Sequence, residues 1–277
     1  MWDRLRSAAG RQAPWLRAPL PAGPGCCAVC RGPARPGFRR CYQCALHRHD
    51  AAGMLADIVV PVSYSVAGTG YARALWHYKS DAHDQDAAGR ALRAMLLVFL
   101  HDHGRCIWSR ARMAAPTHVA VVPSGRGRPG THPLQALVQP YLALPWADLA
   151  ICARDPVPAR DLDPGRFRAR ARLAGASVLL LDDTWTSGSS AQSAAVALKR
   201  AGAGRVAVVT LGRHVNPGER AAGSAAAVLA RRAFRPDLCA VHGTEAGTAA
   251  GSGAERAARP RPPAVMAAAL TSGRSPR

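Results

Sequence analysis

The segment from Ser177 to Leu211 constrains the fold of this chain more than any other part of its sequence. An apolar run at 177–181 predicts a buried strand, 188–201 predicts a helix that stops before Gly202, and 205–211 predicts a second apolar strand. Strand, loop, helix and strand within about 35 residues form a βαβ unit, whose two strands must run parallel. The sequence therefore predicts an α/β fold with an open, mostly parallel sheet flanked by helices.

The turn between this first strand and its helix concentrates polar chemistry. Asp182 and Asp183 follow the apolar run, at the strand end where ligands bind in open α/β sheets. A run of small residues then opens the helix, whose first amides are unpaired and attract phosphate. Its members are Thr186, Ser187, Gly188, Ser189 and Ser190. Carboxylates beside a phosphate site suit sugar hydroxyls and a hydrated Mg²⁺, so the cluster predicts a phosphorylated sugar as ligand.

This turn has two alternative interpretations, a simple helix cap and a Walker-B strand. An Asp turn followed by a serine N-cap explains one aspartate and one serine but not the whole cluster. A Walker-B strand of a nucleotide hydrolase requires a phosphate-binding loop in which lysine follows glycine. The chain has only Lys79 and Lys199, and neither follows a glycine, so that class is excluded.

The N-terminal part predicts a metal site. Cys27 and Cys30, then Cys41 and Cys44, form two C-x-x-C pairs, which together complete a tetrahedral site of four thiolates typical of structural Zn²⁺. Disulfides or free thiols are the alternative. The neighbouring Cys26, His47 and His49 are interpreted as bystanders, and Cys239 with His242 as a packed cysteine and a surface histidine.

The remaining elements are less sharply defined. Residues 58–64 predict a strand that Pro61 either places at a sheet edge or ends early. Helices are expected at 86–103, at 133–144 with Pro140 limiting the length, and at 219–232, and a short strand is expected at 118–122. Residues 153–172 are predicted to form a mobile loop.

Composition and charge add a second function class. The formal net charge is +20, from 37 basic and 17 acidic residues, which is the balance of a polyanion-binding protein. Nearly all of the positive charge is arginine and it is spread along a chain rich in Ala, Gly and Pro, as GC-rich coding produces. No apolar stretch approaches the length of a membrane span, so the expectation is a cytoplasmic protein with no membrane partner.

The pattern from Val178 to Ser190 resembles the hallmark of the type I phosphoribosyltransferases: four apolar residues, two acidic residues, two variable residues, then a hydroxyl-rich run around glycine. Together with the four-cysteine module, the chain is similar to the ComF-like branch of that family, whose members are often labelled amidophosphoribosyltransferase-like. The resemblance implies an arm at 1–24 that is disordered, a zinc ribbon at 25–50, a phosphoribosyltransferase-like domain at 51–243 and a disordered tail at 244–277.

The resemblance also implies roles for single residues. Asp182 and Asp183 would hold the ribose hydroxyls, directly or through Mg²⁺, and residues 186–190 would cradle the 5-phosphate of phosphoribosyl pyrophosphate. The pyrophosphate loop would be formed by Ser124, Gly125 and Arg126, with Gly127 and Arg128 after them. Arg166, with Arg160 and Arg168, would lie in a hood loop that closes over the site; a solvated mobile loop is the plainer interpretation of these arginines.

The implied activity is transfer of the phosphoribosyl group to an unidentified acceptor, with a nitrogen nucleophile favoured, and release of pyrophosphate. Thr186 stands where purine-salvage relatives carry an aspartate base, which argues against a purine acceptor. The alternatives are a non-catalytic sensor or adaptor that binds phosphoribosyl pyrophosphate, such as a ComF-like accessory protein of DNA uptake, and a nucleic-acid-binding protein. The zinc module, with Arg39, Arg40 and Tyr42, would suit a nucleic-acid or protein partner, and a homodimer is left open.

Overall fold

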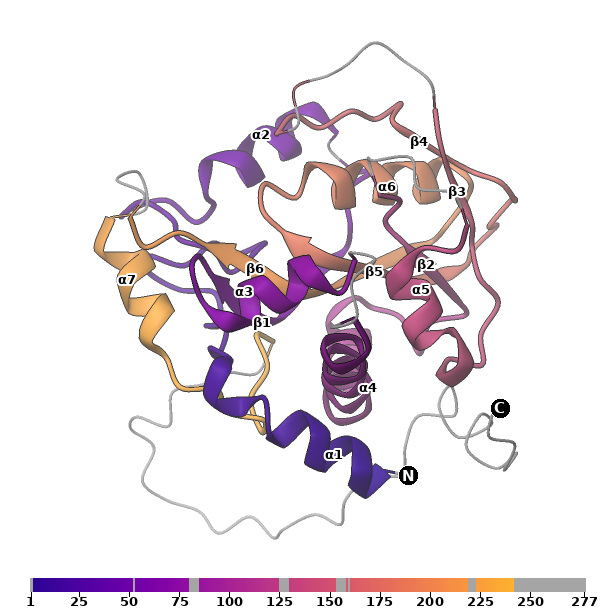
Figure 1. Cartoon of the computed structure of the whole chain (residues 1–277). Coiled ribbons are helices and arrows are strands. Elements are labelled where there is room, and N and C mark those ends of the chain that lie inside the picture. Colours follow the sequence, from indigo (N-terminus) through magenta and orange to yellow (C-terminus); the bar gives the residue numbers. More distant parts are fainter. Residues whose placement is uncertain are drawn as a thin grey trace, which may run out of the picture.

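The structure of the 277-residue chain is a computed structural model (Figure 1). It describes residues 2–51, 53–79, 85–124, 130–152, 158, 160–218 and 223–241.

A parallel sheet forms the centre of the molecule. Its order is β1 (Ile58–Val66), β6 (Arg205–Val215), β5 (Ser177–Trp185), β2 (His118–Val121), and each neighbouring pair is parallel. The two central strands are buried nearly throughout, as expected for strands covered on both faces. The predicted open parallel sheet is confirmed, and Pro61 does lie on an edge strand, where its missing N–H breaks no ladder between two neighbours.

Helices cover the two faces of this sheet (Figure 1). On one face lie α3 (Gly70–His77), α4 (Gln85–Arg110) and α5 (Pro133–Val138). On the other face lie α6 (Ser189–Arg200) and the cysteine segment with α2 (Tyr42–Asp50). Side chains of β5 alternate between the two cores: Leu179 and Leu181 belong to the cluster around α4, and Leu180 to the cluster around α6.

The first 24 residues differ from the disordered arm that was expected. Residues Trp2–Gly10 form α1, which packs on α4, and Arg6 donates two hydrogen bonds to Asp102, at 2.8 and 2.6 Å. A short 3-10 turn at Ala13–Trp15 follows, and Leu16 is 1% exposed in the main core. This packing was not predicted because proline and arginine interrupt the apolar pattern of residues 1–24. The few apolar residues between them are the ones that pack on the core.

The segment after Val121 also departs from expectation in places. Pro140 limits α5 as predicted: the helix ends at Val138 and a 3-10 turn, Gln139–Tyr141, follows. Within the expected loop 153–172, Phe167–Ala169 forms β4, which pairs antiparallel with β3 (Leu149–Ile151). The last helix is α7 (Gly223–Arg231). The predicted tail, 244–277, lies outside the described residues.

Among the helices that the structure describes, none combines the length and the apolar character needed to cross a bilayer.

Candidate phosphate and metal sites

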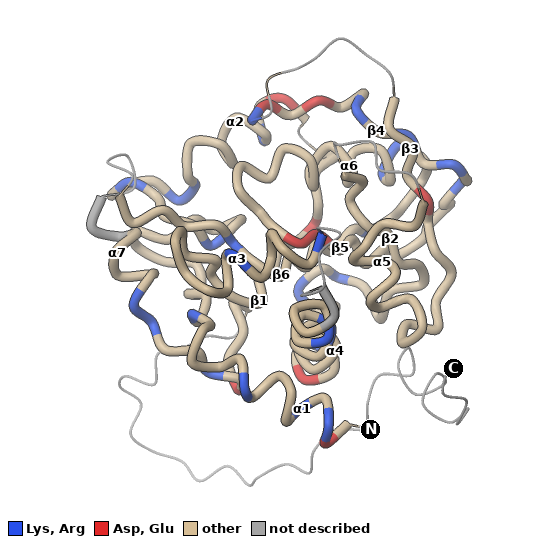
Figure 2. Tube along the Cα trace, in the orientation of Figure 1, with Lys and Arg blue, Asp and Glu red and all other residues tan. Residues whose placement is uncertain are grey.

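The acidic pair lies at the carboxyl end of β5, next to a basic residue (Figure 2). One oxygen of Asp183, Oδ2, accepts a hydrogen bond of 2.7 Å from the Tyr78 hydroxyl and pairs with Lys79 Nζ at 2.5 Å. Tyr78 and Lys79 directly follow α3, the helix that β1 leads into. Asp183 is buried, so a charged carboxylate there requires the compensation that these two groups provide.

Asp182 is in a different electrostatic state. Successive side chains of a strand point to opposite faces, so Asp182 faces the α6 layer whereas Asp183 faces the α3–α4 layer. Burial, and secondly the adjacent charge of Asp183, raise the pKa of Asp182 to about 8, against the opposing effect of Lys79. A carboxyl group of this kind holds its proton at neutral pH unless a cation approaches. Carboxylate oxygens are ligands that Mg²⁺ prefers, so the acidic pair has the right donor chemistry for that ion.

The hydroxyl-rich turn after the acidic pair caps α6. The Ser187 hydroxyl oxygen accepts a hydrogen bond of 3.3 Å from the Ser189 amide and donates one of 3.1 Å to the Ser189 hydroxyl. Gly188 occupies the N-cap position with φ of +85°, and a Cβ there would lie 2.1 Å from a ring carbon of Trp185. The glycine is therefore required by the completely buried indole beneath the turn, a reason that the sequence did not suggest.

A guanidinium group is held at the start of α6. Arg166 Nη1 donates a hydrogen bond of 3.0 Å to the Ser190 hydroxyl. The turn before it is fixed, because the Asp163 amide donates to the Ser193 hydroxyl at 3.0 Å and Asp163 Oδ1 accepts from the Gly165 amide at 2.8 Å. For Arg166 the interpretation as a solvated, mobile side chain is thus wrong, whereas Arg160 and Arg168 are exposed.

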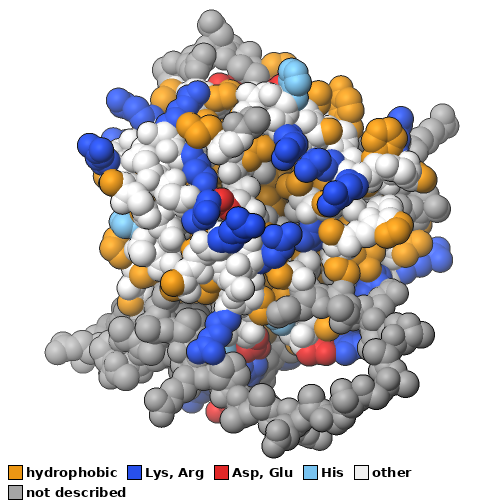
Figure 3. All heavy atoms as spheres, turned by 180° about the vertical axis from the view of Figure 1, so that it is seen from behind, with side chains coloured by type: hydrophobic (Ala, Val, Ile, Leu, Met, Phe, Trp, Pro, Cys, Tyr) orange, Lys and Arg blue, Asp and Glu red, His pale blue; other side chains and the backbone are white. Residues whose placement is uncertain are grey.

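The pyrophosphate loop is only partly described. Ser124 follows β2, which is parallel to its neighbour β5, so it lies at the same end of the sheet as the acidic pair. Gly125 and Arg126 lie outside the described residues, as do Gly127 and Arg128. Basic side chains gather in a band across the face of the molecule seen in Figure 3.

The four predicted zinc ligands do converge. The sulfurs of Cys27, Cys30, Cys41 and Cys44 all lie within 4.8 Å of one another, and Cys30 Sγ is 3.7 Å from Cys41 Sγ. A Zn–S bond of about 2.3 Å in a tetrahedron gives an S–S edge of about 3.8 Å, so the cluster has the dimensions of a zinc site. Hydrogen bonds among these thiols, those of Cys27 first, lower the pKa of Cys30 well below its usual value and raise that of Cys44 well above it, so negative charge is concentrated on one side of the cluster.

The expected bystanders lie outside this set. Cys26 donates from its sulfur to the Arg31 carbonyl at 3.4 Å, and His49 is exposed. The second cysteine pair differs from a ribbon knuckle, because Cys41 is the N-cap of α2 and Cys44 lies in its first turn.

The cysteine cluster shares a core with the sheet. Cys27, Cys30 and Cys44 pack in the same apolar cluster as the inner face of β5. Arg213 of β6 is buried beside it: burial lowers its pKa, but the nearby sulfurs, Cys30 first, raise it more. Its Nη1 donates to the Trp185 carbonyl at 3.2 Å.

Arg213 and Tyr78 are contacts that sequence reasoning missed. Arg213 lies 169 positions after Cys44 (213 − 44), so no local spacing relates them. For Tyr78 a signal existed, because it directly precedes one of the only two lysines in the chain.

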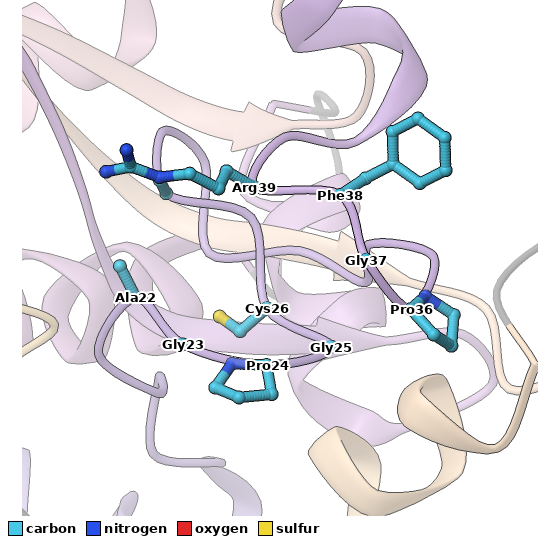
Figure 4. A pocket seen from close by; sticks show the side chains of 10 residues that line it. Ala22, Gly23, Pro24, Gly25, Cys26, Pro36, Gly37, Phe38 and Arg39 are labelled. Atoms are coloured by element: carbon cyan, nitrogen blue, oxygen red, sulfur yellow. The ribbon is translucent and has the colours of Figure 1, made fainter.

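A pocket of about 570 Å³ opens on the cysteine segment (Figure 4). It is lined by residues 22–26, 28 and 36–39, and the side chain of Phe38 is 66% exposed. Arg39 is the charged residue of this lining.

The chain was compared with family models, curated proteins and solved structures. No family model matches the sequence, and no curated protein matches it. Among solved structures, the chain is similar to a purine phosphoribosyltransferase from Pyrococcus horikoshii, with 15% identity and a TM-score of 0.29 over 45% of this chain and 87% of that one. It is also similar to adenine phosphoribosyltransferase from Leishmania tarentolae, with 16% identity and a TM-score of 0.27 over 50% of this chain and 74% of that one. Likenesses at these scores say nothing about the chemistry of this chain.

Proposed function

We propose that this chain binds phosphoribosyl pyrophosphate with Mg²⁺ and transfers its phosphoribosyl group to an acceptor, as a ComF-like phosphoribosyltransferase. One observation carries the proposal: a half-buried and a buried carboxylate lie at the end of a central parallel strand, and the hydroxyl-rich turn beside them opens a helix whose Ser190 is hydrogen-bonded by Arg166. A phosphorylated sugar offers hydroxyls to the acids and a phosphate to the helix start, so it complements both halves.

The residues would divide the ligand between them. The amides and hydroxyls of residues 186–190 would take the 5-phosphate, with Arg166 adding a guanidinium that suits phosphate geometry. Asp182 and Asp183 would face the ribose hydroxyls, and Ser124, Gly125 and Arg126 the pyrophosphate. Mg²⁺, when bound, would neutralise the charge of the leaving pyrophosphate, and the raised pKa of Asp182 means that ligand and metal binding would release a proton.

Catalysis in this arrangement is positioning rather than covalent chemistry. As the bond from ribose C1 to pyrophosphate breaks, positive charge develops on the sugar ring, and a carboxylate held nearby stabilises it. Lys79 already neutralises Asp183 at 2.5 Å, so it would move toward a phosphate oxygen when the ligand enters. The acceptor would be a nucleophile other than a purine, since Thr186 offers no carboxylate base.

The same contact favours a second candidate, a non-catalytic sensor of phosphoribosyl pyrophosphate. If Tyr78 and Lys79 keep hold of Asp183 in the bound state, the protein binds the ligand without stabilising charge on the ribose. Binding and turnover therefore have to be measured separately.

The test is calorimetric titration with phosphoribosyl pyrophosphate, with and without Mg²⁺. We expect Mg²⁺-dependent binding that weakens at least about tenfold, roughly 1.4 kcal/mol, in Asp183→Asn and in Arg166→Met. Asp148→Asn, which alters an exposed aspartate, is the matched control and should bind like the unaltered chain.

Turnover is followed as pyrophosphate release with ammonia and other nitrogen acceptors. Release supports the transferase, and binding without release across the acceptors supports the sensor. Absence of binding by the unaltered, folded chain overturns both, and DNA affinity that falls steeply with salt would then favour a nucleic-acid-binding protein.

A further inference from the structure

A second cluster of metal-ligating side chains lies away from the four cysteines. His103 and Cys106 are three positions apart on α4, so they occupy the same face of that helix. Cys239 reaches them from the segment after α7. One ring nitrogen of His103 and the two sulfurs all lie within 4.8 Å of one another.

The histidine is oriented as a metal ligand would be. His103 Nε2 lies 2.9 Å from the carbonyl oxygen of Pro236. A carbonyl only accepts, so Nε2 carries the proton and the lone pair of the neutral ring is on Nδ1. Metal-binding histidines commonly donate their second N–H to a backbone carbonyl in this way, which fixes both the tautomer and the ring plane.

The surroundings match a site that is enclosed by protein on most sides. His103 is 6% exposed and Cys239 is 1% exposed, while Cys106 is half-buried. The ring of Phe99 packs on His103 at 5.0 Å between centroids. Cys106 and Cys239 form no disulfide with each other.

We propose that His103, Cys106 and Cys239 form a second metal site, for Zn²⁺ or another thiophilic ion, with the fourth coordination position open to water beside Cys106. One nitrogen and two sulfurs are the donor set that Zn²⁺ takes in sites with three protein ligands. Binding releases the two thiol protons and leaves a neutral site, since two thiolates balance the doubly charged ion. Cys239 is packed in the core, as the sequence predicted, and the proposal adds a role for its sulfur; His242 lies outside the described residues.

The proposed ion would join distant parts of the chain. Ala240, next to Cys239, accepts a hydrogen bond of 3.1 Å at its carbonyl from Arg31 Nε in the cysteine segment. The segment 233–241 is therefore held by the cysteine segment and, through the second ion, by α4.

The experiment is the zinc content of the full chain, purified without chelator and measured by atomic emission. Two zinc sites predict about two ions per chain, falling to about one in Cys239→Ser and in His103→Ala. Cys152→Ser, which removes a cysteine outside both clusters, should keep about two ions. Zinc absorption spectroscopy of the unaltered chain should give mean ligation by three sulfurs and one nitrogen or oxygen.

Three results would overturn the proposal. The first is one zinc per unaltered chain with pure four-sulfur ligation. The second is an unchanged zinc content in folded Cys239→Ser. The third is a mass lower by two hydrogens with one zinc, which would identify a Cys106–Cys239 disulfide. If the variants unfold, the ligation and content of the unaltered chain decide the matter without them.

Discussion

Gly188→Ala tests how tightly the phosphate-binding turn is built on the core. The change has two costs. An alanine at φ of +85° costs about 1–2 kcal/mol because the left-handed region brings Cβ toward the carbonyl oxygen. The new methyl would also lie 2.1 Å from a ring carbon of Trp185, which is 0% exposed and cannot move into solvent, and such overpacking costs about 1–3 kcal/mol. The total is about 2–5 kcal/mol.

Urea unfolding followed by circular dichroism measures this loss. Gly68→Ala is the matched control, because Gly68 has φ of +81° and a Cβ there meets nothing within 4 Å. We expect the control to lose only the conformational part, about 1–2 kcal/mol, with an unchanged dependence on urea in both variants.

A double-mutant cycle with Trp185→Leu isolates the contact. Removing the indole should make the glycine substitution cheaper by about 1–3 kcal/mol, although the tryptophan replacement is itself costly. The reasoning is refuted if Gly188→Ala and Gly68→Ala are equally destabilising, or if the cycle shows no coupling.

Three further outcomes are expected. Leu16→Ala should lower the free energy of unfolding by about 2–5 kcal/mol, whereas Trp15→Ala, at an adjacent residue 59% exposed, should change it by about 0.5 kcal/mol; equal effects would contradict the docking of residues 1–24. Burial raises the pKa of Asp102, but hydrogen bonds, that of Arg6 first, lower it by more, so the net shift is downward. This carboxylate therefore stabilises the fold above its unfolded pKa of about 4, and the contribution disappears as the pH falls below that value. Asp102→Asn should therefore cost about 0.5–1 kcal/mol at pH 7 and nothing near pH 2 in urea unfolding; a cost independent of pH would be contrary. Arg213→Met should release zinc to a chelator faster than the unaltered chain in a colorimetric assay, and an unchanged rate would show that the guanidinium does not hold the thiolates.

Local patterns in the sequence predicted the centre of the fold. The apolar strands and the intervening helix at 177–211 are encoded by contiguous residues, so periodicity and Gly202 were sufficient to place them. Pro61 predicted the edge strand because its missing N–H has a direct consequence for pairing. The cysteine spacing likewise predicted a cluster that the structure brings together.

Features that depend on tertiary contacts were not predictable in this way. The three residues of β4 carry no signal until β3 supplies a partner. Cys239 is separated from His103 by 136 positions (239 − 103), so only the folded chain shows that they meet. The aspartates were found from their place after a strand, but their unequal environments arise from Lys79 and Tyr78, which follow α3 about 100 positions earlier and meet Asp183 only in the folded chain.

The buried guanidinium of Arg213 couples the four-cysteine cluster to the carboxyl end of β5. The sulfur of Cys30 is the main counter-charge of this guanidinium, so a loss of negative charge on that sulfur would leave a cation without a partner inside the core. Arg213 also donates a hydrogen bond to the carbonyl of Trp185, two residues after Asp183. A movement of β6 that relieved the unpaired charge would therefore also displace the end of β5. A change in the charge of the cysteine cluster would thus be transmitted to the acidic pair through β6.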